Sequence, residues 1–534
     1  MRTVFSLYRV SAVTAVAVVG ISLGFVASQR AQACGDYTTL LHPKSVEQWA
    51  KEAVSENPEI ASRATQHLRA LGQPGLDAMF RVHEQEIAAL RLPLLVTPAG
   101  DNDAGRTRLK AALEAVAQQR DCEASKLFWY TDLDQAKAAA VAAGNKPILS
   151  LRLLGKLNEE YSCANSRFFR TTLYANQEVA AYLRDHFILH WQSVRPVPRI
   201  TVDFGDGRRI ERTITGNSIH YVLNAKGQVV DALPGLYGAR AFLAGLQNAE
   251  GAARQLNGLS EGAPRAAFLQ AYHTSAESQI QTAFFRDLSR VEPQMPAPLL
   301  TSLGFNGPLL KLELTKANGP AARIPSATDA GARAFAKTAI ESPLLRPGGR
   351  PAPGARPGSE RIENNISDET WQKIAALHAD DAKLDQGART LIGRKSPDAR
   401  KAALVTAGKR IVEDPLLRSL RNLERSIAED TVRNEYTMHT KIHEWLAAEP
   451  SPELAGLNSR VYAELFLTPD SDPWLGLVPA DTYSALDNNG LTLAAPAGGG
   501  GSIAGTIEPH CVPSRASEVT SGSFLPLWAI KSVQ

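Results

Sequence analysis

Residues 147–169 read PILSLRLLGKLNEEYSCANSRFF, and the predicted fold depends on this stretch. The apolar run from Ile148 to Leu154 is long enough for a β-strand that is buried on both faces. Cys163 follows in a turn, just before a predicted helix. A thiol at a helix N-terminus gains reactivity, because the helix dipole stabilises the thiolate. The stretch therefore predicts an inner strand followed by a candidate reactive cysteine.

The residues that follow complete an α/β domain. Asn176 is an N-cap signal for a helix, and residues 187–191 are apolar enough for a second buried strand. Residues 199–214 alternate around Asp206 and Gly207, which predicts a hairpin. Residues 219–233 predict a second hairpin, and residues 239–248 a closing helix.

This order of helix, strand, cysteine turn, helix, strand, hairpin and helix resembles the thioredoxin-like fold family over about a fifth of the chain. The resemblance implies a thioredoxin-like central domain flanked by mainly α-helical regions. It also implies a site, with Cys163 and Ser166 in the catalytic positions and Asn217 and Ser218 in the substrate-binding positions. Two residues depart from the family pattern: Ser166 replaces its second cysteine, and Ser218 stands where the family has a cis-proline.

A lone thiol beside a serine restricts the chemistry of this site. Cys163 could attack a disulfide and form a mixed disulfide with a protein partner, but Ser166 cannot resolve it. One interpretation is therefore a monothiol redox or partner-trapping role, as a possible thiol-disulfide oxidoreductase or isomerase. The alternative is a non-catalytic thioredoxin-fold interaction or scaffold protein, in which Cys163 is a buried residue.

A second candidate site lies near the C-terminus. Glu435, His439 and His443 are spaced four residues apart, so they share one face of a helix. Two histidines and a carboxylate at this spacing can bind zinc or another transition metal. Metal binding through these three residues is a third, more distant interpretation, and no other cofactor is indicated.

Composition and the N-terminus bear on partners and location. The formal net charge of +3 over 534 residues and the lack of basic blocks argue against a nucleic-acid partner. Arg2 and Arg9 precede an apolar run that ends near an Ala-x-Ala motif, which predicts export to the periplasm or cell envelope. An uncleaved membrane anchor is the alternative, and it would be the only membrane contact.

The chain is long enough for about three or four domains. We expect a signal peptide or anchor over 1–33, a helical module over 34–121, the thioredoxin-like domain over 122–250, a mainly helical and loop-rich region over 251–341, a Pro/Gly/Arg-rich linker over 342–365, a helical domain over 366–490 and a flexible tail over 491–534. The four cysteines, Cys34, Cys122, Cys163 and Cys511, permit three pairings that spacing does not distinguish.

Overall fold

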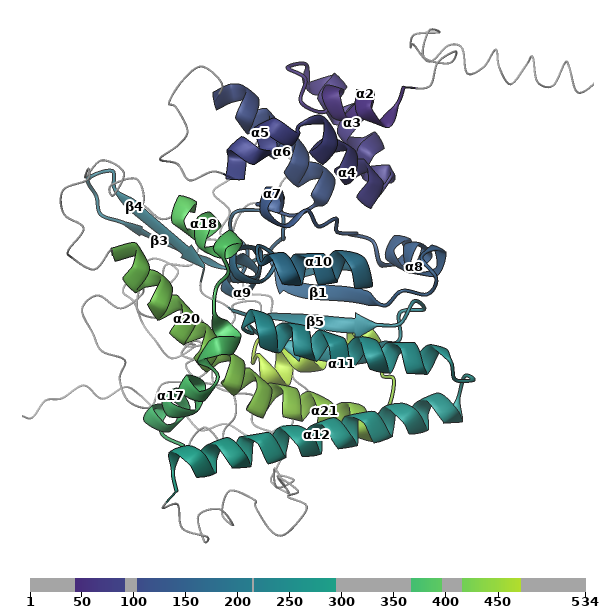
Figure 1. Cartoon of the computed structure of the whole chain (residues 1–534), viewed down its shortest axis with the longest axis vertical. Helices are drawn as coiled ribbons and strands as arrows, with labels where there is room; N and C mark the ends of the chain where they lie inside the picture. Colours follow the sequence, from purple (N-terminus) through teal and green to yellow (C-terminus); the bar gives the residue numbers. More distant parts are fainter. Residues whose placement is uncertain (1–43, 92–102, 214–215, 294–365, 396–414, 472–534) are drawn as a thin grey trace, which may run out of the picture. The chain divides into compact units, whose positions relative to one another are not determined.

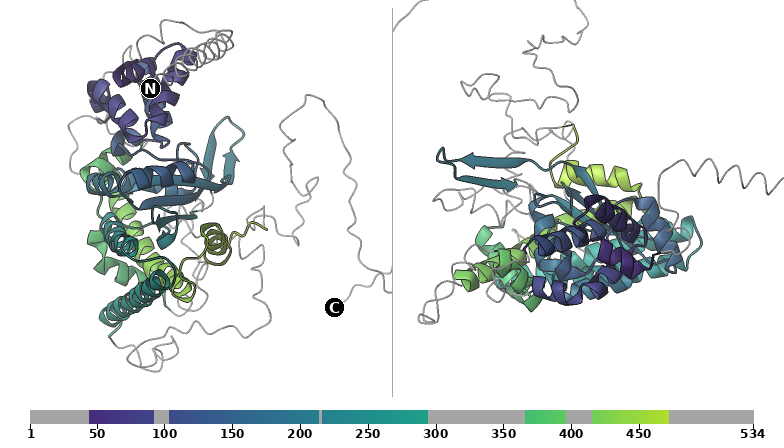
Figure 2. Two further views of the ribbon diagram at one scale, coloured as in Figure 1. Left: turned by 90° about the vertical axis from the view of Figure 1, so that its right-hand side faces the viewer. Right: turned by 90° about the horizontal axis from the view of Figure 1, so that it is seen from above.

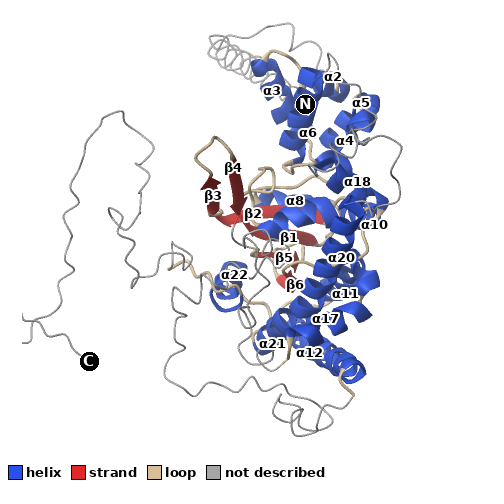
Figure 3. Ribbon diagram, turned by 90° about the vertical axis from the view of Figure 1, so that its left-hand side faces the viewer, coloured by secondary structure: helices blue, strands red, loops and turns tan. Residues whose placement is uncertain are grey.

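The computed structural model describes residues 44–91, 103–213, 216–293, 366–395 and 415–471, all within one compact unit. These residues form a mixed α/β structure in which helices surround a small sheet (Figure 3). The expected α/β centre with helical flanks is thus present. The predicted signal or anchor, the linker and the C-terminal tail lie outside the described residues.

The main sheet has four strands in the order β2-β1-β5-β6. They are β1 (Ile148–Leu154), β2 (Ile188–Arg195), β5 (Ser218–Leu223) and β6 (Val229–Pro234). Strand β1 pairs in parallel with β2 and antiparallel with β5, and β5 pairs antiparallel with β6. Every residue of β1 is buried, which explains its continuous apolar sequence. The predicted inner strand is confirmed.

The two faces of the sheet are covered by different parts of the chain. Side chains alternate along β5, so His220 and Tyr221 point to opposite faces. His220 contacts Phe242 of α11 (Ala239–Asn257), which runs alongside β5 (Figure 1). Tyr221 donates a hydrogen bond to Asn458 of α22 (Leu454–Arg460). The C-terminal helices therefore contribute directly to covering the sheet.

Several other helices position the residues discussed below. They are α8 (Leu133–Ala142), α9 (Ala164–Phe168), the π-helix η2 (Phe169–Leu173), α10 (Gln177–His186) and α12 (Ala263–Val291). The predicted cap of α10 is confirmed, because Asn176 accepts a hydrogen bond from the backbone of Val179 at 3.0 Å. Helix α12 packs along α21 (Thr440–Ala448), as Figure 1 shows.

The N-terminal residues form a helical module with its own hydrophobic cluster, which includes Leu68, Met79 and Leu113. Its helices are α2 (Val46–Glu52), α3 (Pro58–Ala70), α4 (Gln73–Val82), α5 (Glu84–Arg91), α6 (Asp103–Ala117) and α7 (Cys122–Ser125). Local signals fix the starts of the first two. Ser45 and Gln48 form a capping box, and Asn57 caps α3 ahead of Pro58.

The C-terminal helices share the core of the sheet. One hydrophobic cluster includes Leu151 of β1 together with Trp371 and Leu446. The elements here are α17 (Asp368–Leu377), the 3₁₀-helix η3 (Ala379–Ala382), α18 (Gln386–Lys395), α20 (Pro415–Arg433), η4 (Asn434–His439), α21, α22 and η5 (Val461–Leu465), of which η4 and η5 are π-helices. Sheet and helices thus bury one continuous apolar interior.

Strands β3 (Arg199–Asp203) and β4 (Arg209–Thr213) form a separate two-stranded ribbon. The predicted hairpin is therefore confirmed, with Val202 opposite Ile210 in its register. The ribbon extends away from the four-stranded sheet (Figure 2). Its turn contains Gly205 and Gly207 at positive φ, a conformation that glycine adopts without strain.

Candidate functional sites

Cys163 lies where the sequence predicts it, in the turn between β1 and α9. Its backbone N–H donates to the carbonyl of Leu154 at the end of β1, at 2.9 Å, and it is the N-cap residue of α9. Its side chain is fully buried, however, and belongs to the main hydrophobic cluster. A reactive thiol must meet its partner, so this burial differs from the exposed thiol that the redox interpretation requires.

The structure brings three of the four predicted thioredoxin-type site residues into contact. The Cys163 sulfur lies 2.8 Å from the hydroxyl oxygen of Ser218 and 3.3 Å from that of Ser166. Ser166 also donates to the hydroxyl of Ser162, at 2.7 Å. All of these side chains are buried. The sulfur therefore contacts buried hydroxyl groups rather than solvent.

Asn217, the fourth predicted residue, contacts the C-terminal segment. Its side-chain amide donates to the hydroxyl of Thr468 at 2.9 Å, and its backbone carbonyl accepts from the hydroxyl of Tyr462 at 3.2 Å. Arg195, at the end of β2, donates to the backbone carbonyl of Thr468. The edge of the sheet at which the resemblance places a substrate is therefore occupied by residues of the same chain.

The turn itself is fixed by a buried arginine. The guanidinium of Arg170 donates to the backbone carbonyls of Leu157, Glu159 and Glu160 at 3.2, 2.7 and 3.2 Å. These three carbonyls belong to the loop that leads from β1 to Cys163. Arg170 therefore has a structural role in the protein interior.

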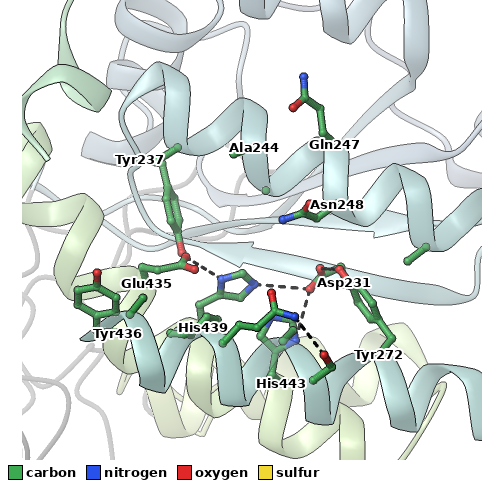
Figure 4. A pocket seen from close by; sticks show the side chains of 18 of the residues that line it. Asp231, Tyr237, Ala244, Gln247, Asn248, Tyr272, Glu435, Tyr436, His439 and His443 are labelled. Carbon is green, nitrogen blue, oxygen red and sulfur yellow. Dashed lines mark hydrogen bonds and ion pairs between the residues drawn. The ribbon is translucent and has the colours of Figure 1, made fainter. Parts of the chain in front are cut away.

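A second cluster contains the three predicted metal-binding residues. Glu435 and His439 lie on η4 and His443 lies on α21. The side chains of His439 and His443 face Asp231 of β6, to which Tyr272 of α12 donates a hydrogen bond, and Glu435 contacts His439 (Figure 4). His273, next to Tyr272, completes the cluster. Asp231, His273, His439 and His443 are all buried.

The distances in this cluster are those of direct contacts. The Nδ1 atoms of His273 and His443 lie 2.8 Å apart. Asp231 Oδ1 lies 4.0 Å from His443 Nδ1 and 3.6 Å from His439 Nε2. The other oxygen of Asp231 accepts from the Tyr272 hydroxyl at 2.5 Å, and Glu435 Oε2 lies 2.8 Å from His439 Nδ1. Three imidazoles therefore converge on one carboxylate.

Burial and neighbouring charges shift the pKa values of these groups in different directions. Burial alone would lower the pKa of His439, but Glu435 and Asp231 outweigh it and raise that pKa to about 10. Burial lowers the pKa of His273 to about 4, and burial and the cationic His439 hold the pKa of His443 well below its usual value. The surrounding histidines, against the effect of burial, hold the pKa of Asp231 below its usual range. Without an ion, the cluster holds one cationic imidazole between two carboxylates.

A cleft opens beside the cluster. It has a volume of about 830 Å³ and is lined by α11, α12 and η4. Asn248 and Gln255 of α11 and Gln279 of α12 line it, together with all of the cluster residues except His273. The cluster is therefore buried, yet it borders a space that a small ion or molecule can enter.

Sequence reasoning missed Asp231 and His273. The signal for Asp231 was present, because a carboxylate inside an apolar strand is costly unless it has a partner. His273 carried no comparable signal, since it lies on a 29-residue helix whose facing partner is set by tertiary packing. Only the packing of α12 against α21 brings His273 to His443.

A third group of carboxylates, Glu114, Asp121 and Glu123, is neutralised by lysine and arginine. Lys110 lies 3.1 Å from Asp121 and 3.4 Å from Glu123, and Lys395 lies 2.6 Å from Asp121. These ion pairs account for the charges of this group, and it is a structural network between α6, α7 and α18.

With both sites described, the chain can be compared with known proteins. No family model, curated protein or solved structure matches it. Within the described ranges, no helix is both long and apolar enough to cross a membrane.

Proposed function

We propose that this protein is a non-catalytic scaffold built on a thioredoxin-like α/β domain. The strand order β2-β1-β5-β6, with β5 antiparallel to β1, supports a thioredoxin-like arrangement. So does the course of the chain from β1 through the Cys163 turn into a helix, and from the β5–β6 hairpin into α11. The N-terminal signal read in residues 1–33 supports a place in the cell envelope.

The observation that carries this proposal is the enclosure of Cys163. Thiol-disulfide exchange requires a thiolate to approach a disulfide sulfur directly. Here the sulfur is fully buried and contacts the hydroxyls of Ser166 and Ser218. The neighbouring Asn217 is hydrogen-bonded to Tyr462 and Thr468. This geometry favours a cysteine that fills the core over one that traps a partner through a mixed disulfide.

The β3–β4 ribbon supports a role in protein contacts. Val202, Phe204 and Ile210 expose 45, 52 and 43% of their surface. Large apolar side chains that gather on an exposed element are typical of protein interaction sites. Because this ribbon pairs with no other strand of the described residues, a protein partner could cover it without disturbing the core.

Incubation of the native protein with oxidised glutathione tests the scaffold proposal. Exchange would join glutathione to the Cys163 sulfur and release one reduced glutathione. We expect no modification of Cys163 in the native protein and full modification in urea, measured by mass spectrometry of the Cys163 peptide. Cys122, which is also buried, serves as the internal control. Rapid modification of Cys163 alone in the native protein would instead favour the monothiol redox role.

A further inference from the structure

We propose that Asp231, His273, His439 and His443 form a binding site for a divalent transition metal ion of the zinc class. The inference does not depend on the scaffold proposal, because the site lies in a different cluster of residues. It also changes the ligand set that helical spacing predicts. Asp231 and His273 are added as ligands, and Glu435 becomes a positioning residue.

The ligand atoms of Asp231, His273 and His443 all lie within 4.8 Å of one another, and Nε2 of His439 lies 3.6 Å from Asp231 Oδ1. In a tetrahedral zinc site with bonds of about 2.0–2.1 Å, neighbouring donor atoms lie about 3.3 Å apart. The three measured separations, between Nδ1 of His273 and His443, between Asp231 Oδ1 and His443 Nδ1, and between Asp231 Oδ1 and His439 Nε2, are 2.8, 4.0 and 3.6 Å. They lie on either side of this value, so small side-chain movements would accommodate an ion.

A buried ring nitrogen without a hydrogen bond points to a metal ion at this position. His439 is 5% exposed, and its Nε2 has no hydrogen-bond partner. This nitrogen faces Asp231 at 3.6 Å, as the dashed line in Figure 4 shows. Buried polar atoms are rarely left unpaired, because the loss of water contacts costs free energy. A metal ion bound at this position would displace the proton of the cationic imidazole and bond directly to Nε2.

Hydrogen bonds to the other atoms of the ligand side chains orient them, as in known metalloproteins. Metal-bound histidines usually donate their other N–H to a carboxylate or a backbone carbonyl. His439 meets the Glu435 carboxylate at Nδ1, at 2.8 Å. Tyr272 and the backbone N–H of Ala232 bind the Asp231 carboxylate, at 2.5 and 2.8 Å. These contacts hold the donor atoms toward one point.

The ligand types select the class of metal. Three imidazole nitrogens and one carboxylate oxygen suit Zn²⁺ and its first-row neighbours, whereas Ca²⁺ and Mg²⁺ prefer sites made only of oxygen atoms. Four protein ligands complete a tetrahedral shell, which is typical of structural zinc. The ion would then join β6, α12 and the η4–α21 helix, which come from distant parts of the sequence.

Equilibrium dialysis of the chelator-treated full chain against micromolar Zn²⁺ tests the site. We expect one bound zinc per chain by elemental analysis. We expect His273→Ala and His443→Ala to weaken binding by at least ~100-fold, and Glu435→Ala by about 10–100-fold, the usual cost of losing an outer partner of a ligand. His378→Ala is the matched control, since His378 lines the same cleft but bonds to Asp287. That variant should bind zinc as the unchanged protein does.

X-ray absorption at the zinc edge of the unchanged protein gives a second readout that does not depend on how the variants fold. The proposal predicts only nitrogen and oxygen neighbours, at about 2.0–2.1 Å, with the outer scattering of imidazole rings. A sulfur neighbour at about 2.3 Å would place the ion on cysteine and overturn the proposal. So would the absence of bound zinc, or equal binding by the His273→Ala, His443→Ala and control variants.

Discussion

Replacing Asp231 with alanine should lower the free energy of unfolding of the chelator-treated protein by about 3–5 kcal/mol, the usual cost of removing one partner from a buried ion pair. Asp231 is the carboxylate that faces the cationic His439, and it also accepts hydrogen bonds from Tyr272 and the backbone of Ala232. Its loss leaves buried donors without partners. Urea unfolding monitored by circular dichroism measures the change.

Two variants make this result specific. Asp231→Asn keeps the volume but removes the charge, so it should recover part of the loss. Asp134→Ala removes an exposed carboxylate that pairs with Lys137 on α8, and it should change stability by no more than about 0.5 kcal/mol. Equal effects of Asp231→Ala and Asp134→Ala would show that the buried cluster contributes no particular stability.

Stability should also fall steeply as the pH drops below about 6.5. Burial lowers the pKa of His190 to about 3, and burial likewise lowers the pKa of His220 to about 3. Both rings lie in the sheet core, where His190 bonds to Ser150 and His220 to Tyr174. Because the folded pKa is below the unfolded pKa of about 6.5, their contribution is present above pH 6.5 and is lost as the pH falls toward 3.

The size of this effect follows from proton linkage. Each histidine that is neutral when folded and charged when unfolded adds about 1.4 kcal/mol per pH unit to the slope of stability against pH. We therefore expect His220→Gln to reduce the slope between about pH 6 and pH 4 by roughly that amount. Gln66→Ala on the exposed face of α3 removes no titratable group, so it gives the control and should leave the slope unchanged. An unaltered slope in His220→Gln would mean that this ring is not neutral in the folded state.

Local patterns were sufficient to predict the central strands. The uninterrupted apolar sequence of β1 is typical of a strand that is buried on both faces. The alternation of apolar and polar residues in β3 and β4 predicts a hairpin, and these strands form an exposed ribbon. The position of Cys163 beside Ser166 and Ser218 was also accessible from sequence, because the order of elements fixes which turns meet at the edge of a sheet.

The sequence left the burial of Cys163 as one of two alternatives, and only the tertiary packing distinguishes them. The neighbouring Asn217 is held by Tyr462 and Thr468, which are about 250 residues away along the chain and carry no signal that pairs them with it. The metal cluster shows the same limit. Helical spacing brought His439 and His443 together, whereas Asp231 and His273 join them only through the packing of α12 and β6 on the C-terminal helices.

The Cys163 sulfur is fully buried in the main core, and pulsed alkylation of Cys163 across a urea series measures how far the fold must open to expose it. The rate of labelling reports the free energy of the opening that exposes the sulfur. If the sulfur is part of the common core, this opening free energy should equal the free energy of global unfolding and depend on urea with the same slope. Labelling in the absence of urea at the rate of a free thiol, with no dependence on urea, would contradict the account.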